Sequence, residues 1–486
     1  MSNTDYRMLI DGELVAAADG RVYENINPAT EEVLGTAPKA GAADVERAIL
    51  AARRTFDTTT WSTDAAFRRK CLIQLQAALR ERAEQLRPVL VAEAGLPVAL
   101  THQVGLDGTI EMISHYIDLL GTYEFERVIT PIPGDESAHR IIRREAAGVV
   151  AAITPWNYPL FLALGKLAPS LAAGCTVVLK PAPDTPWNTL EVGRIILENT
   201  DIPAGVVNIV STDDNDVAAL MTTHPAVDAI TFTGSTVTGR RIMAAAAPTV
   251  KRLTLELGGK SSAILLDDAD FAATVPFVVG TTMSHAGQGC GIYSRLLVPR
   301  ARIGEAVEIA AATMQQIPWG DPTDPGNYMG PVANKRQYES VLRYYELAAK
   351  DGRVVVGGKA SDRFGKGYWV EPTVVTDIDS MSPVAQEEIF GPLLCVLPFD
   401  SDDEAVAISN NTIYGLAGGV WSPDLDRATR VAHGMRASAI QINDQMWNHQ
   451  TAPFGGYKQS GIGREWGVEG LEDLLEVKTI AQPAKQ

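Results

Sequence analysis

Short apolar runs alternate with longer amphipathic stretches through the middle of the chain. After residue 146 these runs are Val149–Ile153, Thr176–Leu179, Val206–Val210 and Ala229–Phe232, and each gap between them is long enough for a helix. Strands that are apolar throughout are typical of a parallel sheet that helices cover on both faces. The pattern therefore predicts an α/β fold built on a doubly wound, Rossmann-like sheet.

A second alternation of the same kind follows and predicts another α/β domain. Its apolar runs are Ser261–Leu266, Arg295–Val298 and Leu393–Leu397. Ahead of both alternations, residues 45–90 are rich in helix-forming residues with apolar positions three and four apart, which predicts surface helices.

The segment from Glu124 to Arg144 matches neither pattern. Two prolines and a glycine at 131–134 precede a stretch at 140–144 that mixes Arg and Ile, and residues 476–480 near the C-terminus mix charged and apolar positions similarly. Together these segments predict a small set of strands that extends away from either core.

The composition disfavours several classes of function. The chain has 486 residues, 46% of them hydrophobic, which is enough for two or three domains, and its net charge of −17 disfavours nucleic acid and anionic membranes as partners. Residues 1–7 carry no secretory signal, and no stretch reaches the roughly 20 apolar residues of a membrane span. The four cysteines lie far apart without a His cluster, so we expect no disulfide framework, no metal site and a cytoplasmic location.

Cys290 is the first candidate for chemistry. It lies in the run Ser-His-Ala-Gly-Gln-Gly-Cys-Gly at 284–291, where flanking glycines give a thiol room to act as a nucleophile. A lone cysteine is more often a small buried hydrophobe, so the thiol becomes a candidate only in company with other groups.

Four further segments contain residues that could act together with Cys290. They are Thr154–Pro159, Phe232–Ser235, Leu255–Lys260 and Glu388–Pro392. In this order and at these separations, they and the Cys290 run resemble the aldehyde dehydrogenase superfamily over nearly the whole chain. The resemblance implies a non-acylating oxidoreductase that converts an aldehyde to a carboxylic acid with NAD(P)+, through a thiohemiacetal and a thioester on Cys290. It also implies a homodimer or homotetramer.

Two polar residues suit this chemistry. Attack of a thiolate on an aldehyde creates an oxyanion, and the Asn157 side chain and the Cys290 N–H are candidate donors to it. Glu256 lies in an apolar run, where burial raises a carboxyl pKa toward that of a general base. Alternatively, Asn157 satisfies its own turn and Glu256 joins an ion pair. The resemblance makes Glu256 the base that activates water, and places Lys166 and Glu465 in a proton relay.

The cofactor site is expected at the strand, turn and helix of residues 229–240, because such a turn presents backbone N–H groups to phosphate. Arg240 and Arg241 stand where a P-loop needs Lys and Ser or Thr, and the usual Gly-x-G-x-x-Gly spacing is absent, so a plain turn remains an alternative. The resemblance implies cofactor contacts at Ile153, Trp156, Lys180, Gly234, Ser235, Glu388 and Phe390. Among these it puts Gly234 and Ser235 at the pyrophosphate, Lys180 on the adenosine ribose, and Glu388 and Phe390 at the nicotinamide ribose and ring.

Three positions bear on specificity. His285 stands where the family usually has Asn; it either supports neighbouring side chains, the favoured reading, or lowers the thiol pKa as a cation. Pro183 replaces a Glu that repels a 2′-phosphate in many NAD-preferring members, so we expect NAD as the usual cofactor with tolerance of NADP. Residues 445–450 mix aromatic and polar side chains without Arg, which leaves a carboxylate-bearing substrate no obvious partner there.

Three rival functions remain. A CoA-acylating dehydrogenase would use a thiol in place of water, and Glu256 argues against it. A catalytically silent nucleotide-binding protein of this fold is disfavoured because nucleophile, oxyanion donor and base occur together. A cofactor-free cysteine hydrolase needs a paired His, and only His285 is near in sequence.

By the resemblance, the chain divides into three parts. We expect an NAD(P)-binding domain, a catalytic α/β domain and a small β element for oligomerisation. These correspond respectively to residues 1–123 with 147–258, residues 259–460, and residues 124–146 with 461–486.

Overall fold

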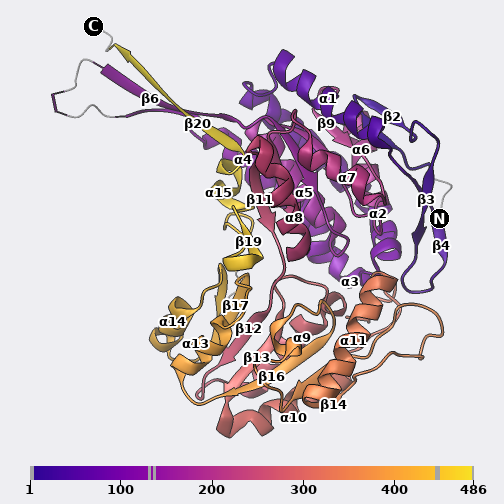
Figure 1. Ribbon diagram of the computed structural model, residues 1–486, viewed down its shortest axis with the longest axis vertical. Helices are drawn as coiled ribbons and strands as arrows, with labels where there is room; N and C mark the ends of the chain where they lie inside the picture. Colours follow the sequence, from indigo (N-terminus) through magenta and orange to yellow (C-terminus); the bar gives the residue numbers. More distant parts are fainter. Residues whose placement is uncertain (1–4, 130–132, 135–137, 444–448, 484–486) are drawn as a thin grey trace.

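The computed structural model describes residues 5–129, 133–134, 138–443 and 449–483, and places two helix-covered sheets in separate halves (Figure 1). Each half has its own apolar core. The predicted α/β fold with a doubly wound sheet is confirmed.

The first sheet has eight strands in the order β19-β11-β10-β7-β8-β9-β1-β2. The five strands from β11 to β9 are mutually parallel, and the pairs β19–β11, β9–β1 and β1–β2 at the two edges are antiparallel. Every residue of β7, β8 and β10 is buried, which is why most of their positions are apolar. In sheet order the bounds are β19 (Gly461–Ile462), β11 (Arg252–Glu256), β10 (Ala229–Thr233), β7 (Val149–Ile153), β8 (Thr176–Lys180), β9 (Val207–Ile209), β1 (Met8–Ile10) and β2 (Glu13–Val15).

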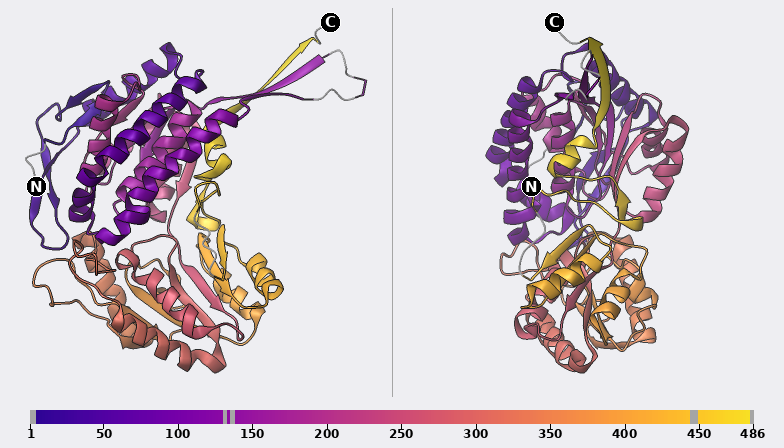
Figure 2. Two further views of the ribbon diagram at one scale, coloured as in Figure 1. Left: turned by 180° about the vertical axis from the view of Figure 1, so that it is seen from behind. Right: turned by 90° about the vertical axis from the view of Figure 1, so that its left-hand side faces the viewer.

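Helices cover both faces of this sheet (Figure 2). They are α1 (Ala42–Thr58), α2 (Ala65–Ala94), α3 (Val98–Leu100), α4 (Asp107–Thr122), α5 (Pro159–Ala173), α6 (Trp187–Asn199), α7 (Asn215–Thr223) and α8 (Thr236–Ala246), with a π-helical turn η1 (Thr101–Gly105) and a 3-10 turn η2 (Ala247–Thr249). The predicted surface helices at residues 45–90 correspond to α1 and α2, and each keeps an exposed face. Helices α4, α5 and α6 pack against α2 and enclose Leu72, Leu75 and Leu79 completely.

The second sheet has seven strands in the order β14-β15-β16-β13-β12-β17-β18, parallel except for the β14–β15 pair. The strands are β12 (Ser261–Leu265), β13 (Tyr293–Pro299), β14 (Arg353–Val356), β15 (Thr373–Thr376), β16 (Leu393–Phe399), β17 (Ala417–Trp421) and β18 (Ala439–Ile442). The helices are α9 (Phe271–Met283), α10 (Ile303–Gln316), α11 (Lys335–Asp351), α12 (Pro383–Gln386), α13 (Asp402–Asn410) and α14 (Leu425–Gly434), with 3-10 turns η3 (Ser284–Gly287), η4 (Arg300–Arg302) and η5 (Lys458–Ser460).

Three strands form an arm that projects from the first half (Figures 1 and 2). They are β5 (Glu126–Ile129), β6 (Ala138–Ala146) and β20 (Leu475–Pro483), and β6 pairs antiparallel with both others. The predicted joining of the 140–144 and 476–480 segments is confirmed, because Glu476 pairs with Glu145 and Ile480 with Ile141. Between β19 and the arm, α15 (Gly467–Glu472) packs on α5.

Near the N-terminus, β3 (Val22–Ile26) and β4 (Val33–Pro38) form a separate hairpin. Within the described ranges, no helix combines the length and the apolar character that crossing a membrane requires.

Candidate active site

Several predicted site residues lie at the carboxyl ends of the parallel strands of the first sheet. Ile153, Lys180 and Glu256 are the last residues of β7, β8 and β11, and Gly234 directly follows β10. The strand register pairs Ile153 with Lys180, and Thr233 with Glu256. Open α/β sheets bind their ligands outside this edge. The strand order therefore brings together residues that are more than 100 positions apart in the sequence.

The Cys290 thiol lies near the Glu256 carboxyl group, and each group affects the pKa of the other. Burial raises the pKa of the thiol well above its ordinary value, and the neighbouring carboxyl adds to this. Burial also raises the pKa of Glu256, and Glu465 raises it further. A buried carboxyl group with a raised pKa, in contact with a thiol, can accept a proton from the thiol. The other three cysteines are buried in the cores.

Asn157 is held against the loop that carries the thiol. Its Nδ2 atom donates a hydrogen bond to the Gln288 carbonyl at 2.8 Å. Gln288 is fixed in turn, because its Nε2 atom donates to the His285 carbonyl at 2.9 Å and its Oε1 atom accepts from the Ala333 N–H at 2.8 Å. The second N–H of the Asn157 amide takes no part in these bonds. It is therefore a fixed donor that can point at a developing oxyanion.

Lys166 and Glu465 form a buried ion pair, although 299 residues separate them. Two hydroxyl groups of β10 complete the cluster. The Lys166 ammonium donates to Thr233 Oγ1 at 2.7 Å and to Thr231 Oγ1 at 3.2 Å, and Thr231 donates to Glu465. The charges of both Lys166 and Glu465 act on the Glu256 carboxyl group, so the cluster lies close to it.

The turn after β10 leads into helix α8. Ser235 is the N-cap of that helix, and its hydroxyl oxygen accepts from the Thr238 N–H. Gly234 precedes it at a position where an added Cβ would collide with the Phe232 ring. A glycine before a capped helix N-terminus leaves backbone N–H groups accessible to an anion.

Lys180 is buried, and its amine donates to the Pro181 carbonyl at 2.8 Å. Burial lowers the pKa of this amine to about 8. Glu388 crosses from the second half and accepts a hydrogen bond from the Gly259 N–H at 2.9 Å, while burial raises its pKa to about 7. An added Cβ at Gly258 would collide with this carboxyl group, so a larger residue there would displace the Glu388 side chain.

Phe390 has a left-handed backbone, with φ of 56°, and its ring meets the Trp156 ring edge-on at 5.4 Å. The ring pair adjoins segments from both halves, since Trp156 follows β7 and Phe390 precedes β16.

His285 is completely buried, with its ring 5.2 Å from that of Tyr158. Burial lowers its imidazole pKa to about 4, so the ring is neutral at neutral pH. A neutral imidazole cannot act as the cation that would lower the thiol pKa. This leaves the supporting role, which is consistent with the His285 carbonyl holding the Gln288 side chain.

Sequence reasoning did not single out Gln288, Thr231 or Thr233 as site residues. Gln288 lies two positions before the nucleophile, and the threonines alternate along β10, but neither signal is specific. Of the predicted substrate-facing stretch 445–450, residues 445–448 lie outside the described part of the chain.

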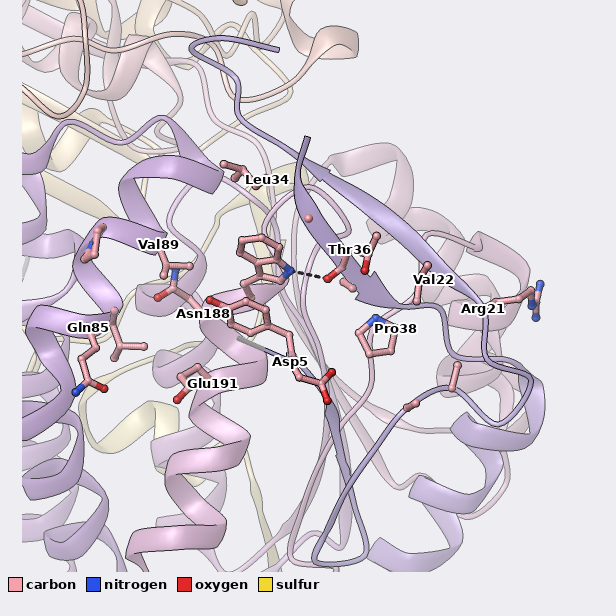
Figure 3. A pocket seen from close by; sticks show the side chains of 18 of the residues that line it. Asp5, Arg21, Val22, Leu34, Thr36, Pro38, Gln85, Val89, Asn188 and Glu191 are labelled. Carbon is pink, nitrogen blue, oxygen red and sulfur yellow. Dashed lines mark hydrogen bonds between the residues drawn. The ribbon is translucent and has the colours of Figure 1, made fainter. Parts of the chain in front are cut away.

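A cavity of about 820 Å³ lies in another part of the first half (Figure 3). It is bounded by the β3–β4 hairpin, α2 and α6, and the Trp187 indole donates to the Thr36 carbonyl beside it. No predicted catalytic or cofactor residue lines it, so it is separate from the candidate site.

Comparisons with known proteins agree with this geometry. The sequence profile described as the Aldehyde dehydrogenase family matches residues 14–480. The 3-succinoylsemialdehyde-pyridine dehydrogenase of Pseudomonas sp is 40% identical, over 98% of each chain. The crystal structure of a Cys-to-Ala variant of aldehyde dehydrogenase C from Pseudomonas syringae, complexed with NAD+ and octanal, is similar with a TM-score of 0.94 and 39% identity, over 99% of this chain and 97% of that one. The crystal structure of betaine aldehyde dehydrogenase from Staphylococcus aureus in complex with NAD+ is similar with a TM-score of 0.94 and 36% sequence identity. The match covers 100% of this chain and 96% of that one.

Proposed function

The chain belongs to the aldehyde dehydrogenase family, and we propose that it oxidises an aldehyde to the carboxylic acid through a covalent intermediate on Cys290. The location of the Cys290 thiol near Glu256, at the carboxyl end of β11, carries this proposal. Overall, the aldehyde, NAD(P)+ and water give the acid, NAD(P)H and a proton. A panel of aldehydes, followed by reduced-nicotinamide absorbance with NAD and NADP in parallel, tests it.

The protein's own residues account for most steps. Glu256 accepts the thiol proton as Cys290 attacks the carbonyl carbon, and the Asn157 amide and the Cys290 N–H hold the oxyanion of the thiohemiacetal. A nicotinamide held beside Phe390 and Trp156 would supply the acceptor for the hydride that leaves the carbon. Glu256 then takes a proton from the water that attacks the resulting thioester. Lys166 and Glu465 pass that proton away from Glu256 through the buried cluster.

The described residues fit a dinucleotide. Ser235 and the α8 N-terminus offer N–H groups to a pyrophosphate, Gly234 leaves room for it, and Lys180 lies at the end of β8 in the same sheet. Glu388 would hold the nicotinamide ribose, while Phe390 and Trp156 would pack against the ring. Ile153 lies between β10 and Lys180 and would contact the adenosine side.

We expect the preference between NAD and NADP to be modest. Pro183 lines a cavity of about 430 Å³ together with Asp184, Lys335 and Arg336. Burial raises the pKa of Asp184 and Arg336 opposes that effect, so the carboxyl group has a cationic neighbour that weakens its repulsion of a 2′-phosphate. The difference in transition-state free energy between NAD and NADP should stay under about 2.7 kcal/mol, which corresponds to roughly a hundredfold in kcat/KM.

Pro183→Glu should shift the preference toward NAD, and Pro183→Gln is the uncharged control. Comparison of kcat/KM for both cofactors in the three proteins tests the assignment. If Glu has no more effect than Gln, the loop does not face the ribose.

We propose that the arm is the oligomerisation element of a homodimer or homotetramer. The proposed division of the chain is an NAD(P)-binding domain of residues 1–123 with 147–258, a catalytic domain of residues 259–460, and the oligomerisation element of residues 124–146 with 461–486. The arm carries the exposed residues Val128 and Val477, and β20 is a nine-residue edge strand, a type of surface that pairs with other chains.

All four cysteines are free thiols, which supports the proposal of a cytoplasmic protein.

Val477→Asp should weaken self-association at least tenfold, because it places a charge in an apolar contact between subunits. Size-exclusion chromatography with light scattering across a dilution series measures the change. Val33→Asp, at an exposed valine of the β3–β4 hairpin, is the matched control and should leave the mass unchanged. A monomeric wild-type protein would contradict the assignment of the arm.

A further inference from the structure

Gln288 is a completely buried glutamine, two positions before the thiol, that joins three segments of the chain. Its Nε2 atom donates to the His285 carbonyl at 2.9 Å, and its Oε1 atom accepts from the Ala333 N–H at 2.8 Å. Its backbone carbonyl accepts from Asn157 Nδ2 at 2.8 Å. The loop that carries the thiol, the segment before α11 and the turn after β7 therefore meet at this residue.

The orientation of the Asn157 amide depends on the Gln288 carbonyl. Asn157 is 4% exposed, and its Oδ1 atom is enclosed without a hydrogen-bond partner among the residues that the structure describes. Within the same residues, the bond from Nδ2 to Gln288 is what restrains rotation of the amide group. Rotation would break this bond and redirect the remaining N–H. Because an oxyanion donor stabilises charge only where it is fixed in advance, the position of the Gln288 carbonyl matters to the reaction.

The backbone directly ahead of Gln288 is strained. His285 and Ala286 have φ of 48° and 54°, left-handed values that are unfavourable for residues with a Cβ atom and persist where the surrounding structure enforces them. The backbone N–H and the Nε2 atom of Gln288 both donate to the His285 carbonyl, at 3.2 and 2.9 Å, and so close this turn. Loss of the side-chain bond would let the turn relax and carry the Gln288 carbonyl with it.

The bond between Asn157 and Gln288 also crosses from one half of the molecule to the other. Asn157 follows β7 of the first sheet, whereas Gln288 precedes β13 of the second. The Ala333 N–H, just before α11, anchors the Gln288 amide within the second half. A carbonyl on an untethered loop would shift relative to the other half, whereas the Gln288 side chain is bound at both of its polar atoms and keeps the carbonyl in place.

We propose that Gln288 is a positioning residue, whose side chain holds its own carbonyl where that carbonyl orients the Asn157 amide toward the oxyanion. The inference rests on the proposed function, because it concerns the donor side chain of that reaction. In this role Gln288 acts through Asn157 and not on the aldehyde directly. Its loss should therefore slow the formation and collapse of the thiohemiacetal, and it should have no effect once Asn157 is absent.

A double-mutant cycle on the full-length enzyme tests this dependence. Single-turnover NADH formation, with saturating NAD+ and enzyme in excess over the aldehyde of the panel that the wild type oxidises fastest, measures the chemical step. Loss of an oxyanion donor costs about 10²–10³-fold, so loss of its orientation in Gln288→Met should slow NADH formation at least about tenfold. In the Asn157→Ala background the same substitution should change the rate less than about twofold. Equal losses in both backgrounds would overturn the proposal.

Gln288→Glu is a second variant for the same cycle, because Gln288→Met leaves the buried Ala333 N–H without an acceptor and so destabilises the fold. The carboxyl group keeps that acceptor. Its loss of rate should be smaller than that of Gln288→Met and should likewise disappear in the Asn157→Ala background. A loss that persists without Asn157 would contradict the proposed role.

Alkylation of the Cys290 thiol by iodoacetamide separates orientation of Asn157 from order of the thiol itself. The thiolate attacks a saturated carbon and iodide leaves, so no oxyanion forms and no donor is needed. Gln288→Met should therefore keep the wild-type alkylation rate within about threefold, as followed by mass spectrometry of the Cys290 peptide. A loss of alkylation parallel to the loss of NADH formation would mean that Gln288 orders the thiol, and would overturn the proposal.

Gln76→Met is the matched control. Gln76 is a buried glutamine of α2 whose Nε2 atom donates to the Ile110 carbonyl at 3.0 Å and to Ser114 Oγ at 2.7 Å. This variant also loses two hydrogen bonds of a buried amide, so it should lose stability but keep the single-turnover rate within about twofold. A loss as large as that in Gln288→Met would overturn the proposal. A wild-type enzyme that oxidises no aldehyde overturns the proposed function, whereas equal losses in the cycle overturn this inference alone.

Discussion

Cys290→Ala should abolish aldehyde oxidation while cofactor binding stays largely intact. The thiol comes from the loop before β13, whereas the turn that faces the pyrophosphate follows β10, so loss of the sulfur leaves that turn unchanged. Activity should fall more than about a thousandfold, which corresponds to over 4 kcal/mol of transition-state stabilisation. Turnover and cofactor titration on the same preparation measure both effects.

Cys71→Ala is the matched control, because that thiol is buried in the core of the first half, on helix α2. It should keep the chemistry and lose only some stability. Retention of more than about one-thousandth of the wild-type activity in Cys290→Ala would contradict covalent catalysis by this thiol.

Glu256→Gln should allow one round of hydride transfer and then stall. The amide cannot accept a proton from water, so a burst of NADH near one equivalent per active site should precede slow turnover. Because the Glu256 carboxyl group also contacts the thiol, the burst itself should be slower than in the wild type. Rapid-mixing absorbance separates the burst from the steady state, and Glu46→Gln, at an exposed acid of α1, is the control.

The pH dependence gives a second reading of the same variant. Burial, and then Glu465, raise the pKa of Glu256, so this group is protonated at pH values where an exposed carboxyl is already ionised. Wild-type deacylation should therefore increase as the pH rises through that raised pKa, and Glu256→Gln should lose the increase. Loss of the burst altogether would mean that Glu256 is required before hydride transfer. Undiminished steady-state turnover in Glu256→Gln would mean that Glu256 has only a structural role.

The sequence by itself determined the α/β class and the main strands. Runs such as Val149–Ile153 are apolar at every position because helices cover both faces of the sheet, and this requirement is visible without a structure. It also indicated Cys290 and Glu256, since a thiol between glycines and an acid in an apolar run are both unusual local choices.

Only the tertiary structure decided how these residues meet. Lys166 and Glu465 form an ion pair across 299 residues, and local sequence spacing carries no information on such a distance. Helical periodicity likewise indicates the apolar face of α2 but not that α4, α5 and α6 are the elements that pack on it. The packing of Met112 and Phe161 against Ala417 and Ala439 likewise depends on β17 and β18 of one half approaching α4 and α5 of the other.

His285 shows the division between the two kinds of information most clearly. The sequence identified the residue as a departure from the usual Asn but left a cation and a neutral support as alternatives. Desolvation decides between them, because complete burial without a carboxylate partner disfavours the charged imidazole and lowers its pKa to about 4. A residue's identity is written in the sequence, whereas its protonation state depends on the groups and the solvent that the folded chain places around it.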